Sequence, residues 1–529
     1  MASRNDTIKA ILPQRLTHIR RIVLGEKAAL GLSGGLLFLL FMAAMAAVQF
    51  SSPDLAGVDG YYHIKFASLM RTEGLKPTFP WLPLTILNAR EFYDHHFLFH
   101  ALLIPFTMGD LIAGAKWASV LFASLAFLSV WWLFRSQGIP YAGLWALGLL
   151  ALSEAFLYRM SMPRAQSLSL AVLVLSLYLL FSGKYVYLAP LSITYVWLYD
   201  AFPLILITAL TFTPAVWITE RRLNYRPLLF TAVGIGAGLL LNLYFPHNLI
   251  FILRHLAPKI GGAGDVRVGH EWYPYTTAQI MENSPLALIA FLSGVIALGL
   301  QRQRMEARTA TSLFLAIFFG WLLFQSRRFV EYFPPFALIF AAFAWAPLLT
   351  VQRGTLLTGL NSENKRGFQS DKRDLIRHGL FLACLTAGLL AGTLFTLRAA
   401  RESIQGSQPH TLYAGAAGWL SANSPERARV FQTDWDDFPR LFFYNTHNTY
   451  LVGLDPTYLQ IFDPQLYDLW VNITRGHVED PSAEIQASFG ATFVFSDLDH
   501  EGFLDQASRD LGLEEVYRDQ EAVIFRIRE

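Results

Sequence analysis

The chain has 529 residues, of which 53% are hydrophobic and only 16% charged, and its mean hydropathy is +0.36. A soluble protein of this length needs more charge to cover its surface, so the composition favours a polytopic α-helical membrane protein. The formal net charge of +2 gives no indication of nucleic acid, and we expect no such partner. The single cysteine, Cys384, excludes an intrachain disulfide and a cysteine metal site.

The N-terminal segment is basic and precedes the first long apolar run, at about 29–49. The segment has no convincing small-residue cleavage site, so we interpret the run as an uncleaved first span. Lys and Arg near span ends resist export, which predicts a cytoplasmic N-terminus. The region 50–114 is then external. Within it, 97–112 carries Pro105 and Asp110 and is predicted to be an interfacial or re-entrant helix.

Further apolar runs predict about eleven spans in total. They lie at roughly 115–134, 142–158, 167–182, 185–199, 201–219, 227–245, 285–300, 309–325, 329–349 and 378–398. With this count most basic clusters fall in cytoplasmic loops, as the positive-inside rule requires. The exceptions are the clusters around Arg159, around Arg254 with Lys259, and around Arg327.

The composition changes in the tail, 399–529, which is richer in Asp, Asn, Ser and charge. Alternating apolar residues at 521–527 and the run 491–497 predict strands, with helical stretches between them. We therefore expect a transmembrane domain over 1–398 and a C-terminal extracytoplasmic α/β domain over 399–529.

The segment from Asp59 to His100 gathers acids, histidines and tyrosines in a chain that is otherwise mostly hydrocarbon. Asp59 follows the first span directly, and Tyr61, Tyr62 and His63 come next. Charge beside a bilayer is costly unless it has a use, so this segment is the first candidate for chemistry. An aromatic belt at the lipid–water interface explains the same residues equally well.

A second cluster in this segment contains Asp94, His95, His96 and His100. His96 and His100 share one helical face at i and i+4, a usable spacing for metal ligands. Asp94 and His95 lie at the helix start, where an acid also serves as a cap. The cluster predicts either a metal site or a capped interfacial helix with solvated histidines, and the local pattern favours the second.

Two arginine pairs are predicted to face outward, against the charge rule. Arg159 and Arg164 flank Pro163 in a turn between two spans, and Arg327 and Arg328 precede a late span. Arg matches phosphate in a bidentate fashion, so the two pairs together predict a pyrophosphate site. Snorkelling to lipid headgroups explains either pair alone equally well.

The external loop 246–284 carries Glu271 among aromatic residues, after a glycine-rich hinge at 261–264. A flexible loop that delivers one acid and several aromatics is typical of a lid, and a solvated loop is the alternative. Asp200, at the end of another span, is placed either to bind an acceptor or to cap the next helix.

In their order along nearly the whole chain, these residues resemble the GT-C superfamily of membrane glycosyltransferases. The resemblance is greatest to the catalytic subunit of oligosaccharyltransferase in its single-subunit archaeal and bacterial forms. It rests on Asp59 with Tyr61, Tyr62 and His63, on Arg159, on the segment Val196 to Asp200, on Glu271, on Arg328-Phe329, and on Asp434-Trp435-Asp436-Asp437-Phe438.

The resemblance implies transfer of a sugar or oligosaccharide from a polyprenyl-(pyro)phosphate carrier to a glycan, lipid or protein acceptor. It implies a GT-C-like domain of about 11 transmembrane helices, surrounded by membrane lipid, with the reaction on the extracytoplasmic face. The implied location is a prokaryotic plasma (inner) membrane. The implied cofactor is a divalent cation, Mg²⁺ or Mn²⁺.

The implied site divides by role. The expected catalytic residues are Asp59, Glu271 and Asp94. The expected substrate-binding residues are Arg159, Arg164, Arg328, Tyr62, His63, Trp435 and Asp436. The expected metal ligands are Asp59, Asp94, His95 and His96.

The chain departs from the family pattern in two places. The family's second acidic motif falls near Gln166 to Leu168, where this chain has no acid, so Asp94 and the histidines are candidates to replace it. The tail motif keeps one Trp and one Asp of the family's Trp-Trp-Asp-Tyr-Gly sequence, so peptide specificity does not carry over.

The alternative function is a non-catalytic transporter or export component for polysaccharide or lipid-linked glycan. It predicts ionisable residues inside the spans, along a pathway. The acids and arginines of this chain are mostly predicted at the external ends of the spans instead, which favours the glycosyltransferase.

Overall fold

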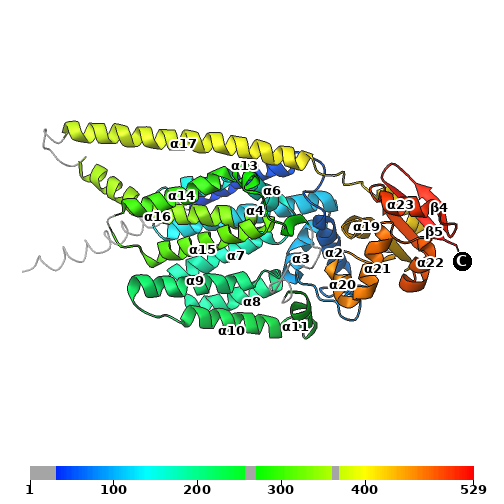
Figure 1. The fold of residues 1–529 in the computed structure, drawn as a ribbon. Helices are drawn as coiled ribbons and strands as arrows, with labels where there is room; N and C mark the ends of the chain where they lie inside the picture. The colour runs from blue at the N-terminus through cyan, green and yellow to red at the C-terminus, as the bar shows by residue number, and fades with distance from the viewer. Residues whose placement is uncertain (1–30, 257–269, 302, 360–367, 529) are drawn as a thin grey trace, which may run out of the picture.

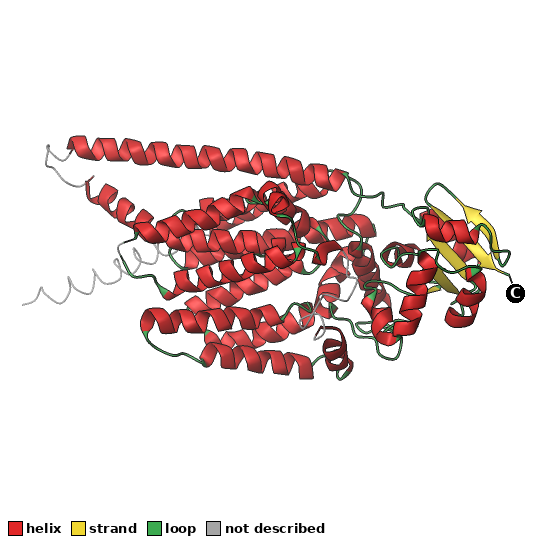
Figure 2. Ribbon diagram, viewed as in Figure 1, coloured by secondary structure: helices red, strands yellow, loops and turns green. Residues whose placement is uncertain are grey.

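The computed structural model describes residues 31–256, 270–301, 303–359 and 368–528 and shows a helical bundle with a smaller mixed domain at one end (Figure 1). Every strand in these ranges lies in the mixed domain, as the colours of Figure 2 show. The apolar runs fold as helices because a bilayer offers no water partner for open backbone N–H and C=O groups.

Among the described residues, five helices are long and apolar enough to cross a membrane. They are Gly31–Gln49, α4 (Leu111–Ser136), α9 (Pro203–Glu220), α15 (Ala307–Gln325) and the first part of α16 (Phe333–Gly359). Two bent pairs raise the number to seven: α6 (Glu154–Ser161) with α7 (Gln166–Phe181), and α13 (Thr277–Asn283) with α14 (Pro285–Leu300). The chain is therefore a polytopic membrane protein.

The remaining predicted spans are shorter, broken or continuous with another element. Three described segments are shorter apolar helices. The first, Phe97–Thr107, consists of α3 (Phe97–Leu103) and η1 (Ile104–Thr107), and the second, Tyr185–Leu198, consists of η3 (Tyr185–Tyr187) and α8 (Leu188–Leu198). The third is α10 (Arg226–Leu240). The predicted span 142–158 is divided among α5 (Ala142–Leu147), η2 (Gly148–Leu150) and the start of α6. The predicted span 378–398 lies inside the long helix α17 (Phe368–Gln405), which leads to the mixed domain (Figure 1).

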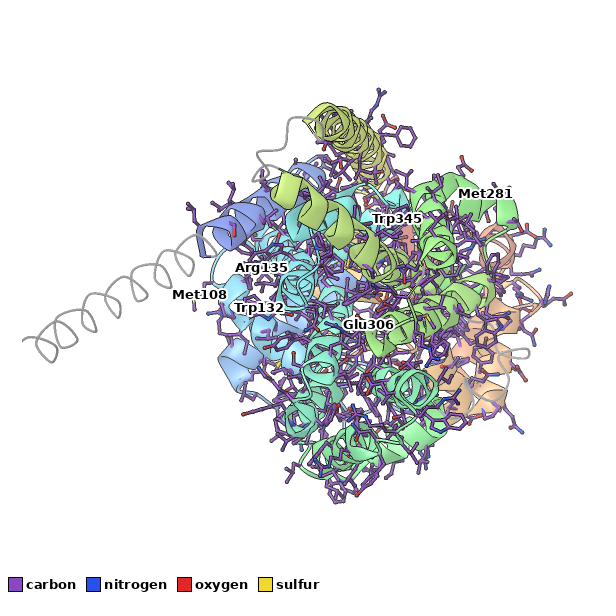
Figure 3. The ribbon with its side chains drawn as sticks, turned by 90° about the vertical axis from the view of Figure 1, so that its left-hand side faces the viewer. Met108, Trp132, Arg135, Met281, Glu306 and Trp345 are labelled. Atoms are coloured by element: carbon purple, nitrogen blue, oxygen red, sulfur yellow. The ribbon has the colours of Figure 1, made fainter. Side chains whose placement is uncertain are left out.

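The two ends of the bundle carry different parts of the chain. The short helices α2 (Asp59–Glu73) and α3 lie between the bundle and the mixed domain (Figure 1). The opposite end, seen in Figure 3, carries Arg135 in the last turn of α4 and Glu306 just before α15. The segments predicted to be external therefore gather at the end that bears the mixed domain.

The mixed domain contains one five-stranded sheet in the order β2-β1-β3-β5-β4. The strands are β1 (Arg429–Gln432), β2 (Thr449–Tyr450), β3 (Phe493–Asp497), β4 (Leu513–Arg518) and β5 (Ala522–Ile527). β1 pairs in parallel with β2 and β3, whereas β5 is antiparallel to β3 and β4. The strands predicted at 491–497 and 521–527 are thus present as neighbours, β3 and β5.

Short helices cover the sheet. They are α18 (Ala414–Asn423), α19 (Phe438–Tyr444), α20 (Thr457–Phe462), α21 (Pro464–Thr474), α22 (Pro481–Glu484), η7 (Ile485–Phe489) and α23 (Glu501–Ala507). Of these, α19 packs against α2.

Aromatic residues fix the mixed domain onto α2. The Phe442 ring lies 5.8 Å from that of Tyr62 and 4.9 Å from that of Trp81, between ring centroids. The backbone N–H of Tyr450 donates to the Trp81 carbonyl at 2.8 Å, and Trp81 Nε1 donates to the Thr446 carbonyl at 2.8 Å. One apolar core therefore joins the domain to the external segment and holds it over the start of α2.

Two glycines of α10 permit close packing against α8. A Cβ at position 234 would lie 2.3 Å from the Ala189 carbonyl oxygen, and one at position 238 would lie 3.0 Å from Val196 Cβ. Small residues four positions apart allow two membrane helices to approach closely. Gly236, between them, has nothing within 4 Å of its Cβ position.

We predict that Gly234→Ala lowers the thermal unfolding temperature of the purified protein in detergent, because the backbone of α8 must move. Gly236→Ala is the matched control and should leave that temperature unchanged or raise it slightly, since Ala favours a helix over Gly by about 1 kcal/mol. Equal effects of the two substitutions would contradict this account of the α8–α10 contact.

Candidate active site

Glu271 lies at the centre of a cluster of three arginines. Its Oε2 atom accepts hydrogen bonds from Arg159 Nη1 at 2.8 Å and from Arg164 Nη1 at 3.0 Å. Arg328 Nη1 lies 3.6 Å from Oε1 of the same carboxylate. The structure thus brings together residues that the sequence places in three separate external segments.

Asp59 joins the cluster through Arg164, whose Nη2 donates to Asp59 Oδ2. Asp59 is the first residue of α2, and Gly60 follows it. A Cβ at position 60 would lie 2.4 Å from Cγ of Pro163, so glycine is needed for the Pro163 turn to approach α2. This close approach allows Arg164 to reach Asp59.

Arg159 lies on α6 and not in the turn where the sequence analysis placed it. The Ser153 side chain caps α6 by accepting from the Phe156 N–H at 3.1 Å, and the helix continues through Ser161. Pro163 then prevents its continuation, because proline cannot supply the N–H that the helix requires. Arg159 therefore projects from a fixed helical turn and is almost fully buried.

Glu331 is a functional candidate that the sequence analysis missed. It lies in η6 (Arg327–Glu331) and is fully buried, and its Oε1 accepts from Arg159 Nε at 2.7 Å and from Arg159 Nη2. The signal in the sequence was an acid three residues after Arg328, at the start of an apolar helix.

The three arginines are balanced by three carboxylates, those of Asp59, Glu271 and Glu331. Burial alone would raise the pKa of Glu271, but the three arginines hold that pKa well below its ordinary value. Glu271 therefore remains ionised at neutral pH and acts as a hydrogen-bond acceptor, not as a proton donor.

Arg328 has the most exposed side chain of the three arginines, at 22% against 10% and 14%. Its Nη2 donates to the Tyr199 hydroxyl at 2.5 Å, and the guanidinium lies 5.1 Å from the Trp272 ring centroid. The Ser326 hydroxyl donates to the backbone carbonyl of Glu271 at 3.0 Å. Arg328 and the Glu271 segment are therefore held together by both backbone and side-chain contacts.

A buried histidine chain lies on α2 and α3. His100 Nδ1 lies 2.8 Å from Asp94 Oδ2, and His100 Nε2 lies 2.7 Å from His63 Nδ1. Because the Asp94 carboxylate accepts a hydrogen bond, the proton of His100 lies on Nδ1. His100 Nε2 therefore accepts a hydrogen bond from His63 Nδ1. Burial lowers the pKa of His63 well below its ordinary value, which keeps that ring neutral.

The structure does not assemble the metal ligands expected at Asp59, Asp94, His95 and His96. Asp59 is engaged by Arg164, while Asp94 binds His100 and also accepts from the backbone N–H of His96 at 3.0 Å. Across the described residues, ligand atoms of three such side chains come within 4.8 Å of one another at Asp434, Asp497 and His500.

The acidic turn, Asp434 to Asp437, follows β1 in the mixed domain. Desolvation, then the carboxylate of Asp434, and also that of Asp59, raise the pKa of Asp436 to about 7. Trp435 packs against the core of the mixed domain. The expected substrate-binding pair in the tail thus lies on one turn of the mixed domain, within reach of the charge of Asp59.

Tyr62 packs beside the buried histidine chain, with the His100 ring 5.6 Å away between centroids. Its buried ring belongs to the aromatic core between α2 and α19, with the Phe66 ring 5.7 Å away between centroids. The ring of the neighbouring His63 is 5.3 Å from that of Tyr62. The structure therefore places Tyr62 in the packing that supports the site.

No family model and no curated protein sequence matches the chain. Its fold is similar to solved structures. The archaeal oligosaccharyltransferase AglB from Archaeoglobus fulgidus, in complex with an inhibitory peptide and a dolichol-phosphate, matches with a TM-score of 0.62 and 13% identity. The match covers 94% of this chain and 74% of AglB.

ArnT from Cupriavidus metallidurans, bound to undecaprenyl phosphate, matches with a TM-score of 0.55 and 16% identity, over 93% of this chain and 97% of ArnT. The chain has the fold of the GT-C glycosyltransferases. The resemblance predicted from the sequence is confirmed at the level of the fold. At these identities the comparison assigns no substrate to this chain.

The buried pair between Arg159 and Glu331 gives a stability prediction. Glu331→Gln should destabilise the protein by about 3 kcal/mol, because removing one partner of a buried ion pair leaves an uncompensated charge. The unfolding midpoint in detergent is the measurement. Glu402→Gln, which breaks an exposed pair with Arg398, is the control and should leave the midpoint unchanged. Equal shifts would contradict the structural role of Glu331.

Proposed function

We propose that the chain is a membrane glycosyltransferase that uses a polyprenyl-(pyro)phosphate-linked sugar or oligosaccharide as donor. The acceptor is a glycan, lipid or protein on the extracytoplasmic face. The observation that carries the proposal is the convergence of Asp59, Arg164, Glu271 and Arg328 in one cluster. The fold shared with AglB, solved with dolichol-phosphate, and with ArnT, solved with undecaprenyl phosphate, supports a lipid-linked donor.

The arginines would bind the donor phosphate. Each guanidinium has five N–H donors. Among the described residues, Arg159 forms three hydrogen bonds to carboxylates and Arg164 forms two. Arg328 forms one, to Tyr199, and has the most donors left. Arg328 is therefore the best placed to hold phosphate oxygens, with Arg164 and Arg159 contributing positive charge behind it.

The reaction forms a bond between an acceptor oxygen or nitrogen and the anomeric carbon of the donor sugar. The bond from that carbon to the phosphate oxygen breaks, and the phosphate leaves with the electron pair. Asp59 is assigned to orient the acceptor and to take its proton, since its carboxylate borders the arginines that hold the leaving group. The charge that develops on the phosphate is stabilised by those arginines.

Two further acids have supporting roles in this proposal. Glu271 is ionised and fixes the directions of the Arg159 and Arg164 side chains. The site is complete when the segment that carries Glu271 lies against η6. Asp94 acts through His100 on His63 and would be a positioning residue. This assignment modifies the direct catalytic role expected for Asp94.

The proposal predicts that Asp59→Asn abolishes transfer while the protein still inserts into the membrane. The cells should then accumulate lipid-linked sugar and lose the glycosylated product, because the donor is made but not consumed. Mass spectrometry of the lipid-linked sugar pool and of cell glycans measures both quantities.

Asp110→Asn is the matched control, because it removes an acid from the same external region. Asp110 caps α4 by accepting from the Ala113 N–H, and Asn is an equally good cap. Wild-type levels of product in Asp59→Asn cells would contradict the proposal. An unchanged sugar pool, with product loss only in the exported fraction, would favour the transporter.

A further inference from the structure

We propose that a cavity at the end of the bundle opposite the mixed domain binds one membrane phospholipid with a phosphoethanolamine headgroup. The cavity has a volume of about 870 Å³ and lies among the ends of α7 and α9, η3 and the start of α15. Ligand pockets usually enclose about 300–1,000 Å³, so this one has room for a headgroup with part of an acyl chain. The proposal goes beyond the transferase reaction and does not depend on it.

The cavity is far from the arginine cluster. Ala307, the first residue of α15, lines the cavity, and Gln325, the last residue of that helix, lies two residues before η6, which carries Arg328. The 19 residues of α15 rise by about 1.5 Å each, so the two ends of the helix are about 28 Å apart. Figure 3 looks onto the end that holds the cavity and labels Glu306 on its rim.

The floor of the cavity is apolar. Leu180, Phe212 and Val216 line it, and each is at most 4% exposed. The Phe212 ring lies 6.3 Å from that of Phe181 and 6.1 Å from that of Tyr185, between centroids, and both of these residues also line the cavity. Hydrocarbon fills such a hollow more favourably than water does. The floor therefore selects a ligand with an acyl chain over a soluble phosphate ester.

The rim of the cavity carries two arginine–glutamate pairs. Arg222 Nε donates to Glu220 Oε2 at 3.1 Å, and Arg308 Nη2 donates to Glu306 Oε2 at 2.7 Å. Within the part of the chain that the structure describes, Oε1 of each glutamate and Nη1 of Arg222 form no hydrogen bond. The rim thus holds two cations and two anions that retain unused donors and acceptors.

These four charges suit a zwitterion. A guanidinium binds phosphate oxygens in a bidentate fashion, and a carboxylate accepts hydrogen bonds from an ammonium group. Phosphoethanolamine carries both a phosphate and an ammonium group on a short linker. Phosphocholine has no N–H to donate, and phosphoglycerol brings no positive charge to Glu220 and Glu306. The rim therefore favours phosphatidylethanolamine over phosphatidylcholine and phosphatidylglycerol.

The test is native mass spectrometry of the delipidated full-length protein in detergent, with dioleoyl-phosphatidylethanolamine added. We expect one bound lipid, held roughly tenfold more tightly than dioleoyl-phosphatidylcholine or dioleoyl-phosphatidylglycerol, because hydrogen bonds between charged groups are the stronger ones. Glycerophosphoethanolamine, which has the headgroup and no acyl chains, should bind far more weakly, since the floor stays unfilled. Equal affinity for the three lipids, or equal affinity for glycerophosphoethanolamine and the lipid, would overturn the proposal.

Rim variants locate the binding site. Arg222→Gln and Arg308→Gln should each weaken binding of phosphatidylethanolamine, and Glu306→Gln should reduce the preference for ethanolamine over choline. Arg135→Gln is the matched control, because Arg135 is an exposed arginine at the same end and outside the cavity lining (Figure 3). It should bind the lipid as the wild type does.

Thermal unfolding separates loss of binding from loss of folding. The Arg222 side chain is 75% exposed, so without lipid Arg222→Gln should unfold at the same temperature as the wild type. Added phosphatidylethanolamine should raise the unfolding temperature of the wild type more than that of Arg222→Gln. Wild-type lipid binding by Arg222→Gln, Arg308→Gln and Glu306→Gln would contradict the assignment of the headgroup to this rim.

Discussion

The ionic contacts of Glu271 are the constraint on which the rest of the site depends. A guanidinium removed from water is stable only when a carboxylate and further hydrogen bonds replace its hydration. Arg159, Arg164 and Arg328 meet this requirement through Glu271 and its neighbours, Asp59 and Glu331. Because the six residues come from four parts of the chain, the ion pairs hold the start of α2, α6 with the turn after it, η5 (His270–Trp272) and η6 in fixed relative positions.

This arrangement gives the site a net charge near zero while many guanidinium N–H groups remain available. An arriving phosphate therefore meets pre-oriented donors and does not have to order three long side chains. Arg328 is best suited to this role, since it is the most exposed of the three and is already oriented by Tyr199 and Trp272. The aromatic packing of Phe442 on Tyr62 and Trp81 holds the mixed domain against α2, whose first residue is Asp59.

Much of the cluster could be predicted from the sequence because its residues violate a general rule. Arginines on the predicted external side oppose the positive-inside rule, which drew attention to Arg159, Arg164 and Arg328. Glu331 was not predicted, because nothing local distinguishes a buried counter-ion from a helix-capping acid beside an apolar run. Its role depends on Arg159, which is distant in sequence.

The partners of the residues that we expected to bind a metal ion also could not be predicted from the local sequence. The spacing of His96 and His100 indicated a shared helical face, but in the structure Asp94 binds His100, which in turn binds His63. The group at Asp434, Asp497 and His500 depends on the parallel pairing of β1 and β3, which no local pattern reveals. The break in the span predicted at 142–158 falls at Ser153, which caps α6 after a run that is uniformly apolar up to that residue.

The most direct test of the central claim is the affinity of the purified protein for undecaprenyl phosphate, measured by native mass spectrometry in detergent. The account predicts that Arg328→Gln weakens binding at least tenfold. Arg327→Gln, which removes a neighbouring arginine that lies over Tyr275 and outside the Glu271 cluster, should bind as the wild type does. Equal affinity of the wild type and both variants would contradict the assignment of the arginine cluster to the donor phosphate.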